Sequence, residues 1–142
     1  LAAAPEFSVR QAVARNPNTP ETSLRALAQD RDPRVHGVLA SNPALPEDVL
    51  RRLAASEYWG VRLFAAKNVR APTDLLLALS RDGHWSVRTA AAGNPATPDA
   101  ALEALRRDGD PRVRAALAER FASAPGIPAA TRPCLGDHDE TA

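Results

Sequence analysis

The sequence predicts an all-α protein, a solenoid of stacked two-helix repeats with no sheet, and three observations lead to this prediction. One residue pattern returns every 26 positions without an insertion, as the series Val9, Val35, Val61, Val87 and Val113 shows. Proline stands at fixed places in the copies, where helices start or end. The apolar residues within each copy follow helical spacing, and no segment alternates like a strand.

The first helix of each repeat is expected to begin at an N-cap acid followed by proline, as in Asp32-Pro33 and Asp110-Pro111. In the first copy Val9, Ala12 and Val13 are spaced i, i+3 and i+4, so we expect them to form the buried face. The later copies place there Val35, Val38 and Leu39; Val61, Phe64 and Ala65; Val87, Ala90 and Ala91; and Val113, Ala116 and Leu117.

This helix is expected to end at Asn-Pro, because a residue before proline is pushed out of the helical region. In the third copy Val69 replaces the proline, whereas Asn68 stays. We therefore predict that the asparagine side chain itself bonds to loop backbone. Alanine recurs just before it, which indicates a close approach of helices; these residues are Ala14, Ala40, Ala66, Ala92 and Ala118.

The second helix should begin with a proline at its first helical position and an acid or threonine beside it. These starts are Thr19-Pro20-Glu21, Leu45-Pro46-Glu47, Ala71-Pro72-Thr73 and Thr97-Pro98-Asp99. The inward residues are expected to be Ser23, Leu24, Leu27 and Ala28; Val49, Leu50, Leu53 and Ala54; Leu75, Leu76, Leu79 and Ser80; and Ala101, Leu102 and Leu105.

One repeat cannot fold alone, because ordering its residues costs about 1–2 kcal/mol each, whereas each buried Leu or Val returns roughly 1.5–3 kcal/mol. Stacking must supply the difference. We expect the array to cover 1–121, with a partial repeat at 1–7, four full repeats over 8–111 and a partial repeat at 112–121. At the end of the array Arg120-Phe121 replaces Asn-Pro, so the repeat pattern stops there. Residues 122–142 are expected to form an irregular C-terminal cap and tail.

Composition argues against several classes of function. The formal net charge is +1 with 25% charged residues, so no strong field points to nucleic acid or an anionic membrane. The single cysteine, Cys134, excludes an internal disulfide and fits a reducing compartment. Without a signal-peptide pattern or a long apolar run, we expect a cytoplasmic protein with no membrane partner.

The repeat reads V-R-x-x-V-A-x-N-P-x-T-P-x-x-x-L-x-x-L-A and resembles the leucine-rich repeat variant family of bacterial proteins over about residues 5–121. The match is carried by Val9-Arg10, Val13-Ala14, Asn16-Pro17, Thr19-Pro20, Leu24 and Leu27-Ala28. The resemblance implies a right-handed superhelix that pairs an α-helix with a short α- or 3₁₀-helix. Some relatives carry a cysteine-ligated iron–sulfur cluster, but a lone cysteine cannot hold one, so we expect no cofactor. HEAT-like repeats are the nearest rival, but their helices are longer.

The slot after each valine forms a basic ladder along one flank, Arg10, His36, Arg62, Arg88 and Arg114. The structural interpretation is that each guanidinium ties neighbouring repeats together through Asp30, Asp82, Asp108 or helix-end carbonyls. The functional alternative is a track for the phosphates of a nucleic acid, which would weaken steeply with salt.

The sharpest departure from the repeat is an aromatic patch, Tyr58, Trp59, His84 and Trp85, flanked by Arg62 and Arg88. The two tryptophans occupy the slot that Pro33 fills, and we expect them side by side, each stacked on the arginine three residues later. Trp, Tyr and Arg are enriched in binding hot spots. The patch therefore predicts a protein or peptide partner, and the alternative is that the indoles merely cover the seam between repeats.

Catalysis has little support in the sequence. His36, His84 and His138 lie far apart in the repeat lattice, and His138 among Asp137, Asp139 and Glu140 is typical of a solvated tail. No phosphate loop, nucleophile elbow or small-molecule site is evident. We expect no enzyme and no metal site, but a repeat scaffold, with nucleic-acid binding as the alternative and domain spacing as a third possibility.

Overall fold

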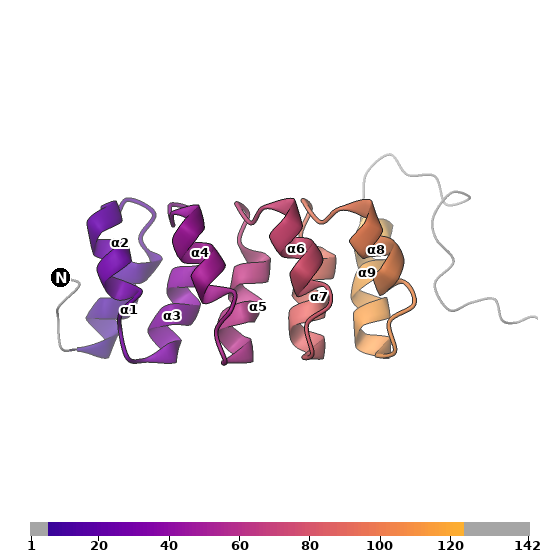
Figure 1. The fold of residues 1–142 in the computed structure, drawn as a ribbon, viewed down its shortest axis with the longest axis horizontal. Helices are drawn as coiled ribbons and strands as arrows, with labels where there is room; N and C mark the ends of the chain where they lie inside the picture. The colour runs from indigo at the N-terminus through magenta and orange to yellow at the C-terminus, as the bar shows by residue number, and fades with distance from the viewer. Residues whose placement is uncertain (1–5, 124–142) are drawn as a thin grey trace, which may run out of the picture.

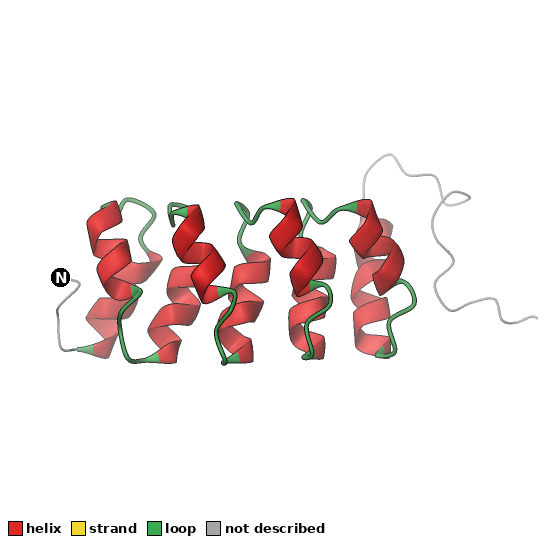
Figure 2. Cartoon of the chain, viewed as in Figure 1, coloured by secondary structure: helices red, strands yellow, loops and turns green. Residues whose placement is uncertain are grey.

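The computed structural model describes residues 6–123, and this part of the chain is a row of helices without a strand (Figure 1, Figure 2). The first helices of the repeats are α1 (Phe7–Arg15), α3 (Pro33–Ala40), α5 (Trp59–Lys67), α7 (Trp85–Gly93) and α9 (Pro111–Ser123). The second helices are α2 (Glu21–Leu27), α4 (Glu47–Leu53), α6 (Thr73–Leu79) and α8 (Asp99–Leu105). Equivalent helices begin 26 residues apart, and the predicted all-α class is confirmed.

The helices form two layers, because α1, α3, α5, α7 and α9 pack on one another while the shorter helices lie against them (Figure 1). The family resemblance left open a 3₁₀-helix in each repeat. In residues 6–123 both helices of every repeat are α-helical, and the second has seven residues. Tighter i→i−3 bonds follow it, as where Gln29 N–H donates to the carbonyl of Ala26 at 3.0 Å.

The core lies between the two layers and repeats with the sequence. Its largest fully buried side chains are Leu24, Leu27, Leu39, Leu50, Leu76, Leu105, Leu117, Val35, Val49, Val61, Val87 and Val113. The recurring alanines at 14, 40, 66 and 92 are 0% exposed, so the predicted close approach of helices is confirmed there.

The prediction for Phe64 was wrong, because its side chain is 40% exposed. In α5 the buried stripe is Val61, Ala65 and Ala66, at i, i+4 and i+5, so it is rotated toward the recurring alanine. The predicted i+3 residue is exposed at Ala12 as well, whereas Ala90 in α7 is buried as predicted, with 7% exposure.

Both kinds of predicted helix start occur. Asp32 caps α3, since its carboxylate accepts the N–H of Arg34 at 2.9 Å. The prolines of the second helices lie one residue earlier than predicted, at the N-cap, as Pro20 does in front of Glu21. Their fixed φ suits this position as well, and the Pro20 carbonyl accepts the N–H of Leu24 at 3.1 Å.

The last described helix is longer than predicted, because α9 continues to Ser123 and so passes the boundary expected at residue 121. With Arg120 and Phe121 in place of Asn-Pro, no proline stops the helix there. The partial repeat predicted before residue 6 and the rest of the predicted cap, with Cys134 and His138, lie outside the described residues. The domain boundaries therefore stay a prediction.

Buried asparagines join consecutive repeats. Asn68 is 1% exposed, and its side-chain N–H₂ donates to the carbonyls of Ala40 at 2.7 Å and Asn42 at 3.1 Å. Its side-chain oxygen accepts the N–H of Arg70 at 2.8 Å. Asn42 and Asn94 make the same three bonds one repeat earlier and one repeat later. The predicted use of the asparagine side chain is thus confirmed, and its partners include helix-end carbonyls of the preceding repeat.

Candidate functional site

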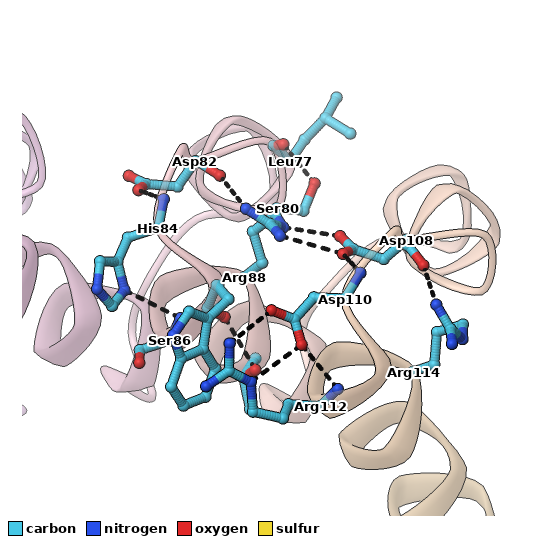
Figure 3. A network of polar contacts seen from close by, with 12 residues as sticks. Leu77, Ser80, Asp82, His84, Ser86, Arg88, Asp108, Asp110, Arg112 and Arg114 are labelled. Carbon is cyan, nitrogen blue, oxygen red and sulfur yellow. Dashed lines mark hydrogen bonds and ion pairs between the residues drawn. The ribbon is translucent and has the colours of Figure 1, made fainter.

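The arginines of the basic ladder form clamps between loops. Arg62 on α5 bonds to both carboxylate oxygens of Asp82, in the loop between α6 and α7, at 2.6 and 3.0 Å. Its other nitrogen donates to the carbonyl of Ser56, in the loop before its own helix, at 2.8 Å. Arg88 repeats the arrangement with Asp108 and the Asp82 carbonyl (Figure 3).

The ends of the ladder differ in their partners. Arg10 pairs with Asp30 at 2.6 Å, as the structural interpretation predicted. Arg114 donates to the Asp108 carbonyl (Figure 3). The paired side chains of Arg10, Arg62 and Arg88 are 17–20% exposed. The ladder is thus engaged in holding repeats together.

At one position of the basic ladder neither member of the arginine–aspartate pair is present. At the second repeat His36 replaces the arginine, and Ser56 replaces the aspartate with which that arginine would pair. Ser56 still accepts a backbone hydrogen bond, because its hydroxyl accepts the N–H of Tyr58 at 3.1 Å. Asp82 accepts the equivalent N–H of His84 at 2.9 Å and in addition pairs with an arginine. The seam between α3 and α5 therefore lacks the clamp that its neighbours have.

The clamps change the acidity of their carboxylates. Burial raises the pKa of Asp82, but the bonds from Arg62 and the His84 N–H outweigh it, so that the pKa is lowered. The same balance, led by burial and reversed by Arg88, lowers the pKa of Asp108. These carboxylates are therefore held in the charged form that the clamps require.

Three rings of the aromatic patch, those of Trp59, His84 and Trp85, form a stack. The imidazole of His84 lies on the indole of Trp59, with ring centroids 4.1 Å apart and planes 5° apart. On its other side His84 stacks on Trp85 at 5.9 Å. The tryptophans thus lie along the same edge, as predicted, with the histidine between them.

The predicted arginine partners of the indoles were wrong, because Arg62 and Arg88 bond to Asp82 and Asp108 instead. The guanidinium over Trp85 belongs to Arg112 of the next repeat, 3.6 Å from the ring centroid. An N-terminal counterpart is Arg34, 4.1 Å over Phe7.

Sequence reasoning missed these two cation–π pairs. The available signal was the spacing, since Arg34 and Arg112 each follow Asp-Pro and come 27 residues after an aromatic residue. Each of these arginines is fixed by the N-cap aspartate before it, as Arg112 is by Asp110 at 2.8 Å (Figure 3).

Part of the patch is open to solvent. Tyr58 is 49% exposed and Trp59 is 47% exposed, whereas His84 and Trp85 are partly covered by their neighbours. Trp59 and Tyr58 line a surface hollow of about 690 Å³ between α1, α3 and α5. Phe64, also exposed, lies in the same hollow. The site is thus an apolar surface next to a rigid aromatic stack.

Residues 6–123 contain no group of three His, Cys, Asp or Glu that could hold a metal ion. His84 is occupied as a helix cap, because its Nδ1 accepts the N–H of Ser86 at 3.1 Å (Figure 3). None of the described helices is long and apolar enough to cross a membrane.

Comparison with known families gives two matches. The Leucine Rich Repeat Variant domain model matches residues 9–62, and the Leucine rich repeat variant model matches residues 85–110. Together they cover more than half of the 142 residues. No curated protein and no solved structure matches the chain.

Proposed function

We propose that this chain, which belongs to the leucine-rich repeat variant family, is a non-catalytic helical repeat scaffold that binds a protein or peptide through its aromatic patch. The observation that carries the proposal is the half-exposed pair Tyr58 and Trp59. Large aromatic side chains on the surface are the residues most often used as binding anchors.

The patch is also preorganised. Trp59 is fixed from one side by the His84 ring at 4.1 Å, and His84 is fixed in turn by its bond from Ser86 N–H at 3.1 Å. Binding would therefore cost little side-chain entropy at Trp59, because this side chain is already held in place. About half of the Trp59 surface stays accessible, which favours binding over the alternative that the indoles only cover the contact between repeats.

The roles of the flanking arginines are revised in this proposal. Arg62 and Arg88 hold the loops that carry the patch, and they reach a partner less readily than a free arginine would, because each is bound to an aspartate. For the same reason nucleic-acid binding through the ladder has less support. Phosphates would have to compete with carboxylates already in place.

The test is a pair of substitutions, Tyr58→Ala with Trp59→Ala, in a pull-down and titration of interacting proteins with the whole chain. Loss of the partner with unchanged helical circular dichroism and melting temperature supports the proposal. A partner retained by the double variant contradicts it. A salt titration separates the alternative, because phosphate binding through several arginines weakens steeply with salt.

A further inference from the structure

Two hollows lie on the same face of the first-helix layer. The hollow between α1, α3 and α5 has a volume of about 690 Å³, and a second one between α5, α7 and α9 has about 610 Å³. Several lining positions are equivalent and lie 52 residues apart, as Gln11 and Arg34 in the first hollow and Leu63 and Ser86 in the second illustrate. The hollows are therefore related by two repeats.

Glycine lines both hollows, Gly37 on α3 the first and Gly93 on α7 the second. Leu63 and Phe64 on α5, the helix between them, form the ridge that separates the hollows. The surface is mostly apolar in both, and aromatic side chains line each one, Trp59 the first and Trp85 the second.

Each hollow has a cation at the same register. Arg15 at the end of α1 lines the first and Lys67 at the end of α5 lines the second. Within residues 6–123 neither of them forms an ion pair. Each hollow also has a second basic residue and one acidic residue, Arg34 with Glu57 and Arg120 with Glu119. The charged lining is thus net basic in both.

The spacing sets the length of a ligand that could fill both hollows. Adjacent packed helices are about 8–10 Å apart, so α3 and α7, two steps apart, are separated by about 16–20 Å. An extended chain covers this distance in about five or six residues.

We infer that the two hollows bind one extended acidic peptide of a partner protein, which places two large apolar side chains, about five or six residues apart, in the hollows and its carboxylates near Arg15 and Lys67. This inference rests on the proposed function and adds the chemistry of the partner to it. The apolar anchors bury surface in the hollows, and the acidic residues complement the unpaired cations.

The experiment selects a random 15-residue peptide library on phage against the whole chain and titrates the enriched peptides by fluorescence anisotropy. The expected sequences have two large apolar residues at the stated spacing, each next to Asp or Glu. The inference is overturned if the selected peptides are basic or have a single apolar anchor, or if no peptide is enriched.

Glycine substitutions then test each hollow separately. A Cβ added at Gly60 or at Gly93 meets no atom within 4 Å, so a side chain at either position starts in open space, and Gly60→Leu and Gly93→Leu should occupy part of the first and second hollows. Each is expected to weaken the selected peptide at least tenfold. Gly83→Leu, which also meets no atom within 4 Å and lines neither hollow, is the matched control and should leave binding unchanged.

Charge reversal tests the second part of the inference. Arg15→Glu and Lys67→Glu should each weaken the peptide at least fivefold, with a smaller loss at high salt. Equal binding by Gly93→Leu overturns the two-hollow inference, whereas loss of the partner by Tyr58→Ala with Trp59→Ala still supports the proposed function. The two failures are thus distinguishable, because Gly93 lies outside the hollow that contains Trp59.

Discussion

Asn68 donates its side-chain amide to the backbone carbonyl of Asn42, the residue at the same position one repeat earlier, over 3.1 Å. Asn94 does the same to Asn68 at 3.0 Å. The bond links each repeat to the one before it and needs no side chain from that repeat. One repeat after Asn94 the asparagine is replaced by Arg120, whose guanidinium donates to the carbonyls of Ala92 and Asn94 in the same way.

Replacing Asn68 with alanine should destabilise the array strongly. The change removes the bonds to the carbonyls of Ala40 and Asn42 and from the N–H of Arg70. The Asn42 carbonyl still accepts the N–H of Leu45 at 3.1 Å, so the groups that lose a partner are the Ala40 carbonyl and the Arg70 N–H. We expect a loss of about 2–5 kcal/mol, because each unsatisfied buried group costs about 1–3 kcal/mol. Urea denaturation measures it. Asn16→Ala is the control, since Asn16 is exposed and its side-chain oxygen accepts the nearby N–H of Asn18 at 2.9 Å; a similar loss there would contradict this account.

Restoring the missing clamp should stabilise the seam between α3 and α5. His36→Arg together with Ser56→Asp recreates the pair seen between Arg62 and Asp82, and the new aspartate can still accept the N–H that Ser56 accepts now. We expect the double variant to gain about 1–2 kcal/mol, in the range of a hydrogen bond to a charged group.

A double-mutant cycle on the same two positions supplies the control. Each single substitution introduces a charge without its partner, so the stability of each single variant should be unchanged or lower. The favourable coupling energy is the diagnostic quantity. Additive effects of the two changes would show that the repeats do not place these residues as Arg62 and Asp82 are placed.

Stability should fall in acid between pH 4 and pH 2. The bonds from the Arg34 guanidinium and N–H lower the pKa of Asp32 from 3.8 to about 2, and Arg112 does the same for Asp110. A carboxylate whose pKa is lower in the folded chain stabilises it fully above the unfolded pKa, and this stabilisation disappears as the pH falls through the folded value.

Thermal unfolding at pH 6, 4, 3 and 2 measures this loss. In Asp32→Asn with Asp110→Asn the pH dependence should be shallower, because two of the titrating groups are gone. An unchanged slope in that double variant would assign the acid sensitivity to other carboxylates, such as Asp82 and Asp108.

Removing the guanidinium over Trp85 should be visible in its fluorescence. In a Trp59→Phe background, which leaves one indole, Arg112→Ala uncovers the ring face that the guanidinium lies over at 3.6 Å. We expect a red-shifted emission and a loss of about 0.5–1 kcal/mol of stability. Arg107→Ala serves as the control, because this arginine side chain is 83% exposed. It should change neither the emission maximum nor the stability. An emission spectrum unaffected by Arg112→Ala would refute the contact.

The contacts of the proposed site residues required the folded chain. Arg62 and Arg88 lie three residues after their tryptophans, a spacing that permits stacking on a helix, yet both bond to aspartates twenty residues later. A bidentate bond to a partly buried carboxylate is stronger than a cation–π contact at the surface, so the ion pair prevails. The patch residues themselves could be identified from the sequence, because they break a pattern that four copies otherwise keep.

By itself the sequence determined the repeat, its two helices, the buried leucines and valines and the use of Asn68, because hydrophobic periodicity and proline placement act locally and recur every 26 residues. Only the tertiary structure decided that Phe64 points outward, that His84 lies between two indoles, and that two hollows open on one face. These features depend on side chains from neighbouring repeats meeting across a seam. That meeting is set by how the repeats stack, and no single copy of the pattern encodes it.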